Sequence, residues 1–253
     1  MPRTRLDTLL VERGLCGSRE RARALILAGR VRVNGQTAHK AGVGVGPGDE
    51  VALDEPDHPY VSRGGLKLAH ALDAFGIPVA GRAALDIGAS TGGFTDVLLR
   101  RGARLVVALD VGHGQIDWRL RTDPRVVVLE RVNARGLTAA QLPESARPVD
   151  LVTIDVSFIS LRVVLPVVPA LLAPWADVVA LVKPQFEAGR AEVGKGGIVR
   201  DPAVHARVLA EVEAAARSLG LARHATVPSP ITGAQGNEEF LMHLRLENPA
   251  HAR

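Results

Sequence analysis

The chain has 253 residues, 47% of them hydrophobic and 23% charged, a balance that is typical of a globular protein and excludes a disordered or fibrous one. Its one cysteine, Cys16, excludes a disulfide within the chain and a cysteine-rich metal site. The charged start and the lack of an uninterrupted apolar run of about 18–20 residues predict a cytoplasmic protein with no membrane partner, and we expect no metal.

Positive charge is concentrated at the beginning of the chain. Residues 1–40 hold nine Lys and Arg against three Asp and Glu, an excess larger than the net charge of +4 for the whole chain. A small basic segment on a near-neutral body indicates a polyanionic partner, most often nucleic acid. A solvated charged surface is the alternative interpretation.

The first elements predict a small α+β unit. Residues 6–14 and 18–29 each carry apolar residues at helical spacing and end at a glycine. Residues 30–40 then alternate as strands around an Asn34-Gly35 hairpin turn, and "VGPGDEVAL" adds a turn and a last strand.

Three stretches of this unit, "RLDTLLVERG", "SRERARALILAGRVRVNG" and "GDEV", resemble in that order the alpha-L, or S4-like, RNA-binding domain. The resemblance covers about residues 3–53 and implies an S4-like RNA-binding domain in 1–53. Prolines and acids then predict a linker at 54–61, a second domain at 62–247 and a tail at 248–253. The expected RNA contacts are Arg5, Arg19, Arg21, Arg23, Arg30, Arg63, Arg190 and Lys195.

The second domain alternates apolar strands with helices, which predicts an α/β fold with a mostly parallel, seven-stranded sheet and helices on both faces. The last strand is expected to run antiparallel. The predicted strands are 83–87, 104–110, 125–130, 149–154, 177–183, 221–227 and 239–246. The predicted helices are 65–75, 93–101, 161–172 and 203–219, the last capped by Asp201 before Pro202.

The stretch "RAALDIGASTGGFTD" predicts a strand, a glycine turn and a helix, the opening unit of a nucleotide-type binding fold. Ser90 replaces the central glycine of the dinucleotide fingerprint, and a carboxylate at Asp86 would repel a pyrophosphate. The cationic S-adenosylmethionine fits better; a purely structural turn is the alternative. Asp110 would hold the ribose hydroxyls and Asn133 the adenine edge. The full set of expected cofactor contacts is Asp86, Gly88, Ser90, Thr91, Gly92, Gly93, Phe94, Asp110, Asn133 and Asp155.

Four charged residues lie at predicted strand ends or loop edges: Lys67, Asp155, Lys183 and Glu239. Each alone has an ordinary interpretation as a surface charge or cap, and Glu238 competes with Glu239. Together they suit alkylation of a weakly acidic hydroxyl, because a second ammonium and partial burial depress the pKa of a lysine from its ordinary value of about 10.4.

The order of these four matches the Lys-Asp-Lys-Glu tetrad of FtsJ-type ribose 2′-O-methyltransferases. "VSRGGLKL", "LDIGASTGGFTD", "DVGHGQ", "DVSFISL", "VKPQFEAGR" and "GGIVRD" resemble the TlyA family over nearly all of residues 3–247. The resemblance implies a Rossmann-like class I methyltransferase that modifies cytidine 2′-hydroxyls in 23S or 16S ribosomal RNA, with ribosomal subunits as partners. It implies Lys183 as the base, Asp155 orienting it, Lys67 positioning the ribose and Glu239 completing the network.

Several alternatives stay open. Family members are also labelled hemolysins, and an RNA-binding scaffold with an inactive methyltransferase domain is another possibility. Phe158 stacks on the target base, packs near the cofactor or packs in the core. Residues 186–201 form either a loop that closes over RNA or a disordered loop. The linker departs from the Arg-x-Trp-Val of some members, because His58 replaces its arginine and Tyr60 its tryptophan. The sequence does not set the oligomeric state.

Overall fold

The computed structural model describes residues 3–16, 18–53, 58–233 and 235–246, so the predicted tail at 248–253 and residues 54–57 lie outside the described residues. The chain separates into two compact units, with the boundary between Pro59 and Tyr60. Tyr60 and Val61, which were predicted to end the linker, pack against the core of the second unit.

The N-terminal unit packs two helices against short antiparallel strands. Helices α1 (Leu6–Glu12) and α2 (Arg19–Leu27) share a hydrophobic core with Val31 and Val45 of the strands. The strands are β1 (Thr4–Arg5), β2 (Val31–Val33), β3 (Gln36–Thr37), β4 (Gly44–Val45) and β5 (Val51–Leu53), paired as β1–β4 and β3–β2–β5. Asn34 and Gly35 both have positive φ, 52° and 78°, which confirms the predicted hairpin turn between β2 and β3.

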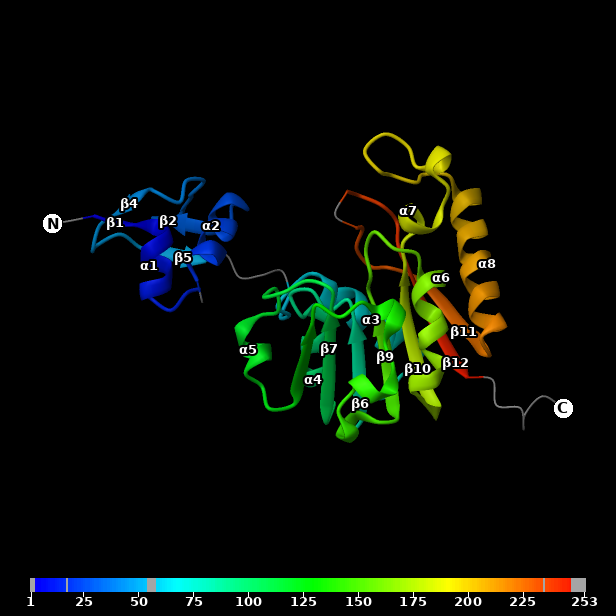
Figure 1. Cartoon of the computed structure of the whole chain (residues 1–253). Helices are drawn as coiled ribbons and strands as arrows, with labels where there is room; N and C mark the ends of the chain where they lie inside the picture. The colour runs from blue at the N-terminus through cyan, green and yellow to red at the C-terminus, as the bar shows by residue number, and fades with distance from the viewer. Residues whose placement is uncertain (1–2, 17, 54–57, 234, 247–253) are drawn as a thin grey trace. The chain divides into compact units, whose positions relative to one another are not determined.

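The second unit is built on a seven-stranded sheet (Figure 1). Its strands are β6 (Ala83–Ile87), β7 (Leu105–Asp110), β8 (Val126–Glu130), β9 (Val149–Ile154), β10 (Leu172–Val182), β11 (Leu221–Pro228) and β12 (Phe240–Leu246). They lie in the order β11-β12-β10-β9-β6-β7-β8. Strands β6 to β10 are parallel and β12 runs antiparallel to both of its neighbours, so the predicted mostly parallel sheet is confirmed.

Helices cover both faces of this sheet. One face packs against α3 (Gly64–Phe75), α4 (Gly93–Arg100) and α5 (Trp118–Arg121). The other packs against α6 (Leu161–Val164) and α8 (Pro202–Ser218). The remaining short elements are α7 (Pro184–Glu187), η1 (Ala134–Gly136), η2 (Ala139–Gln141), η3 (Glu144–Ala146), η4 (Leu165–Val167), η5 (Pro169–Leu171) and η6 (Arg190–Glu192).

The prediction of one helix over 161–172 is wrong. Helix α6 ends at Val164, and the 3₁₀ turns η4 and η5 follow it before β10 begins. Pro166 and Pro169 explain the break, because each removes a backbone donor that a continuous helix needs. Strand β10 begins earlier than predicted and carries an irregularity between Leu172 and Asp177.

The connectivity of the sheet locates a ligand crevice. The chain proceeds outward from β6 to β7 and β8 on one side, and returns to β9 and β10 on the other. In parallel α/β sheets, ligands bind at such a switch point, outside the carboxyl ends of the strands. Among the described residues, no helix is long and apolar enough to cross a membrane.

Candidate functional site

The glycine turn lies at the switch point between β6 and β9. Gly88 follows β6 with φ of +85°, and a Cβ atom there would lie 2.3 Å from the carbonyl oxygen of Asp155 at the end of β9. The amides of Gly88 and Ala89 both donate to the carbonyl of Leu109 near the end of β7, at 2.8 and 3.0 Å. Only glycine fits this position, and the turn joins the ends of three strands.

Asp86 lies beneath the turn and not on its open side. Its side chain is fully buried, and its two oxygens accept hydrogen bonds from the hydroxyls of Thr95 and Thr153 at 2.7 and 2.9 Å. Burial raises the pKa of Asp86 to about 7, against the two hydroxyls, which lower it. The Asp86 carboxylate is therefore not exposed to a ligand in this structure, although the sequence predicted that it would contact the cofactor directly.

The other residues expected to contact the cofactor differ in their exposure to solvent. The Asp110 carboxylate accepts the amides of Ser90 and Gly112 at 2.8 and 2.6 Å, so it faces the rim of the turn. Asn133 is exposed close to the end of β7, and its side chain caps η1. Phe94 is only 3% exposed and packs in the core, so its ring does not contact a ligand and only its backbone borders the turn.

The four predicted charged residues form two ion pairs. Lys183 Nζ lies 2.5 Å from Asp155 Oδ1, and the Lys67 ammonium pairs with the Glu239 carboxylate. The strand register brings the pairs together: Val182 lies opposite Phe240, so the next residues along this ladder are Lys183 and Glu239. Asp155 follows β9, the other neighbour of β10. All four thus gather at one edge of the sheet.

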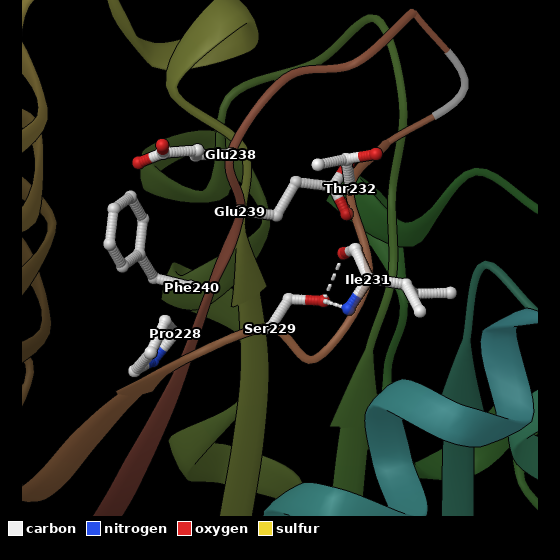
Figure 2. Close-up of a pocket in the computed structure, with 7 residues that line it drawn as sticks. All are labelled: Pro228, Ser229, Ile231, Thr232, Glu238, Glu239 and Phe240. Atoms are coloured by element: carbon white, nitrogen blue, oxygen red, sulfur yellow. Dashed lines mark hydrogen bonds between the residues drawn. The ribbon is translucent and has the colours of Figure 1, made fainter.

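The structure also separates Glu239 from its neighbour Glu238. The Glu239 side chain is 3% exposed, whereas that of Glu238 is 71% exposed and lies 3.6 Å from a ring nitrogen of His205. Figure 2 shows the two carboxylates on opposite sides of the chain. Gly233 makes room for Glu239, since a Cβ there would lie 2.5 Å from Glu239 Oε1.

A cavity of about 290 Å³ borders Glu239 (Figure 2). It is formed by the ends of β11 and β12 and the loop between them, and its lining includes the hydroxyls of Ser229 and Thr232. Its lining residues are Pro228, Ser229, Ile231, Thr232, Glu238, Glu239 and Phe240.

An exposed aromatic side chain adjoins the Lys183–Asp155 pair. Phe158 is 92% exposed and has φ of +61°, which is unusual for a bulky residue and typical of functional sites. Its ring packs on Phe186 with centroids 5.2 Å apart, and Lys183 Nζ lies 5.9 Å from the Phe186 ring centre. The alternative that Phe158 packs in the core is therefore wrong.

Sequence reasoning missed two neighbours of Lys183. Ser157 accepts a hydrogen bond from Lys183 Nζ at 3.0 Å, and Phe186 contacts both Lys183 and Phe158. Ser157 stands two residues after Asp155 in "DVSFISL", and this short spacing could have indicated that Ser157 also lies near Lys183. The sequence does not indicate that Phe186 contacts Lys183, because the position of its ring depends on the short helix α7.

The segment 186–201 is ordered, so the alternative of a disordered loop is wrong. Gly194 and Ile198 form an isolated bridge, and the buried Asn237 side chain accepts the amide of Val199 at 3.0 Å and donates to the carbonyl of Gly197 at 2.9 Å. Arg190 and Lys195 project from this loop as exposed residues. Closure over RNA remains a prediction.

In the N-terminal unit, three of the predicted RNA-binding arginines surround one carboxylate. Asp7 is fully buried and accepts hydrogen bonds from Arg5 at 3.0 and 3.1 Å, and from Arg19 and Arg23 at 3.1 Å each. Each of these arginine side chains is about half exposed. Arg21 lies on the same helix, α2, and Arg63 is exposed at the start of α3 in the second unit.

The strand order, with a glycine turn at its switch point, is that of the class I methyltransferases, which use S-adenosylmethionine. The chain belongs to the FtsJ-like methyltransferase family, whose model matches residues 60–246, and an S4 domain matches residues 4–51. The sequence predicted a resemblance to both families, and both are confirmed.

Relatives narrow the family further. The chain is 51% identical over 249 residues to the 16S/23S rRNA (cytidine-2′-O)-methyltransferase TlyA of Mycobacterium tuberculosis, covering 97% of this chain and 91% of that protein. It is 41% identical to Hemolysin A of Brachyspira hyodysenteriae, covering 94% and 98%. A solved structure of a Streptococcus thermophilus protein named as a hemolysin matches with a TM-score of 0.76 and 45% identity, covering 98% and 90%. The chain is a member of the TlyA family, as predicted.

Proposed function

We propose that this protein transfers a methyl group from S-adenosylmethionine to the ribose 2′-hydroxyl of a cytidine in ribosomal RNA. The observation that carries the proposal is the Lys183–Asp155 pair, which lies at the carboxyl end of the sheet next to the glycine turn. The activity for which the Mycobacterium tuberculosis relative is named supports the substrate class.

The residues around the turn suit this cofactor. Asp110 borders the turn and Asp155 lies beside it, so carboxylates stand where a phosphate-bearing ligand would need cations. An acidic site favours a ligand that carries a sulfonium and an ammonium. S-adenosylmethionine supplies an electrophilic methyl group when it is bound.

In the proposed reaction, Lys183 is the general base. Its neutral amine takes the proton of the 2′-hydroxyl while the oxygen forms its new bond to the methyl carbon and the sulfur–methyl bond breaks. Asp155 orients the amine and stabilises the ammonium that results. Lys67, held by Glu239, positions the ribose and polarises its oxygen.

The RNA is held by backbone contacts and by one aromatic platform. The half-exposed Arg5, Arg19 and Arg23 bind phosphates, and Phe158 stacks on the target base. Arg63, Arg190 and Lys195 add phosphate contacts from the second unit. The proposed ribosomal substrate supports a cytoplasmic location.

The decisive experiment is transfer of tritiated methyl to separated 30S and 50S subunits, with nuclease mapping of the 2′-O-methyl nucleotide. Label on a cytidine ribose supports the proposal and shows which subunit is the substrate. Lys183→Ala and Lys183→Arg should both abolish transfer while subunit binding persists, since arginine keeps the charge but cannot act as the base. A Lys183→Arg variant with normal turnover would disprove the assigned base.

A further inference from the structure

We infer that Ser157 is a positioning residue for the proposed base: its hydroxyl fixes the direction in which the Lys183 amine presents its lone pair. This inference rests on the proposed function. Ser157 Oγ lies 3.0 Å from Lys183 Nζ and accepts a hydrogen bond from it. Asp155 Oδ1 lies 2.5 Å from the same nitrogen.

The geometry of an amine gives these two contacts a specific consequence. A lysine ammonium has three N–H donors, and Ser157 accepts one of them. The Asp155 carboxylate pairs with the ammonium by charge, but its Oδ1 accepts no hydrogen bond from the described residues. After loss of one proton the neutral amine keeps two N–H bonds, and the one that Ser157 accepts limits how the amine can turn. The lone pair then lies away from Ser157. Without Ser157 the amine would lose this directed hydrogen bond and rotate between orientations.

The surroundings of Lys183 restrict it further. The Lys183 side chain is only 10% exposed, and the Phe186 ring lies 5.9 Å from its nitrogen. Ser157 itself is exposed and immediately precedes Phe158, the residue proposed to stack on the target base. One short segment, residues 155–158, thus carries the ion-pair partner of the base, its hydrogen-bond acceptor and the proposed platform for the nucleotide.

In the proposed step, the proton of the 2′-hydroxyl moves to the lone pair of Lys183 and forms the third N–H bond of the ammonium. The oxygen forms its bond to the methyl group as the sulfur–methyl bond breaks, so no further reactant is required. Ser157 exchanges no proton and acts only through Lys183.

The test compares Ser157→Ala, Ser157→Thr and the control Ser218→Ala, which removes an exposed hydroxyl at the end of α8. Ser157→Ala should lower kcat about tenfold, as expected for the loss of one hydrogen bond to a charged group, with KM for the subunit unchanged. Ser157→Thr should restore most of kcat, and Ser218→Ala should match the wild type. Unchanged kcat in Ser157→Ala, or a rise in KM alone, would overturn the inference.

A second measurement does not depend on turnover. The ¹⁵Nζ resonance of Lys183, assigned by its loss in Lys183→Arg, should shift in Ser157→Ala and stay in place in Ser218→Ala. An unshifted resonance would show that Ser157 does not hold the amine, whatever the activity. Absence of methyl transfer by the wild type, together with a shifted resonance, would reject the proposed reaction and keep the contact.

Discussion

Replacement of Phe158 by alanine should separate activity from stability. Phe158 is 92% exposed, so folding buries only a small part of its ring. Full burial of a phenylalanine contributes about 1.5–3 kcal/mol, and the buried fraction here therefore contributes about 0.2 kcal/mol. The contact with Phe186 adds about 1 kcal/mol at most. We expect the free energy of unfolding to change by no more than about 1 kcal/mol.

The effect on methyl transfer should be much larger. Base–aromatic stacking contributes about 1–3 kcal/mol per base, which corresponds to a loss of about 5- to 150-fold in kcat/KM. Phe158→Trp and Phe158→Tyr keep a flat ring and should retain most of the activity. The affinity for S-adenosylmethionine should not change, since the glycine turn and Asp110 are untouched.

The assay measures initial rates of methyl transfer at varied subunit concentration, alongside urea unfolding. Trp175→Ala is the matched control: Trp175 is 69% exposed, and it lies near the start of β10, at the edge of the sheet opposite the site. That variant should keep full activity. Equal activity of Phe158→Ala and the wild type, or an equal loss in Trp175→Ala, would refute a stacking role for Phe158.

The remaining predictions concern stability. Gly88→Ala should cost about 2–4 kcal/mol in urea unfolding, because its Cβ would strike the Asp155 carbonyl, whereas Gly76→Ala, with φ of +63° and no atom within 4 Å, should cost about 1 kcal/mol; equal costs would contradict the packing argument. Because the pKa of Asp86 is raised to about 7, the folded unit keeps a proton that the unfolded chain releases above about pH 4, and the free energy of unfolding should fall as pH rises from about 4 to 7. Asp86→Asn should flatten that slope in denaturant titrations, and an unchanged slope would reject this assignment. The Arg5 guanidinium, with Arg23 and Arg19, holds the pKa of Asp7 well below its usual range, so the stability that Asp7 contributes is present at neutral pH and is lost as pH falls below about 4. Asp7→Asn should lower the free energy of unfolding of the N-terminal unit by about 1–3 kcal/mol, measured in thermal melts. The same variant should bind RNA more weakly although its net charge is more positive, and tighter binding would show that charge alone controls affinity.

Strand periodicity and turn residues made most of the second unit predictable. The apolar runs before Gly88 and Asp155 give buried parallel strands, and the cap at Asp201 marks the start of α8. The predicted helix over 161–172 is wrong because its apolar residues fit a helical pattern, whereas Pro166 and Pro169 break the helix into 3₁₀ turns. Sequence patterns locate a helix or strand well where the spacing of its apolar residues fits only one of the two.

The chemical environment of the site was less predictable, because it depends on side-chain direction. Residue type alone could not show that Asp86 and Phe94 point into the core while Phe158 points out. Alternation along a strand places Asp86 on the face that packs against α4, where Thr95 holds it. The hydrogen bond from Lys183 to Ser157 depends on the turn after β9, for which the sequence carries no periodic signal.

The two lysine–carboxylate pairs differ in the exposure of their carboxylates, and this difference bears on the proposed choice of base. The carboxylate of the Lys67 pair, Glu239, is 3% exposed and borders the cavity beside β11 and β12. The two lysines are buried to a similar extent, at 11% exposed for Lys67 and 10% for Lys183. The carboxylate of the Lys183 pair, Asp155, is 22% exposed and adjoins the outward-facing Phe158. A base must contact the hydroxyl of a large RNA directly, whereas a positioning charge can act on the ribose from a more buried position. This difference between the carboxylates supports the proposal that Lys183, and not Lys67, takes the proton.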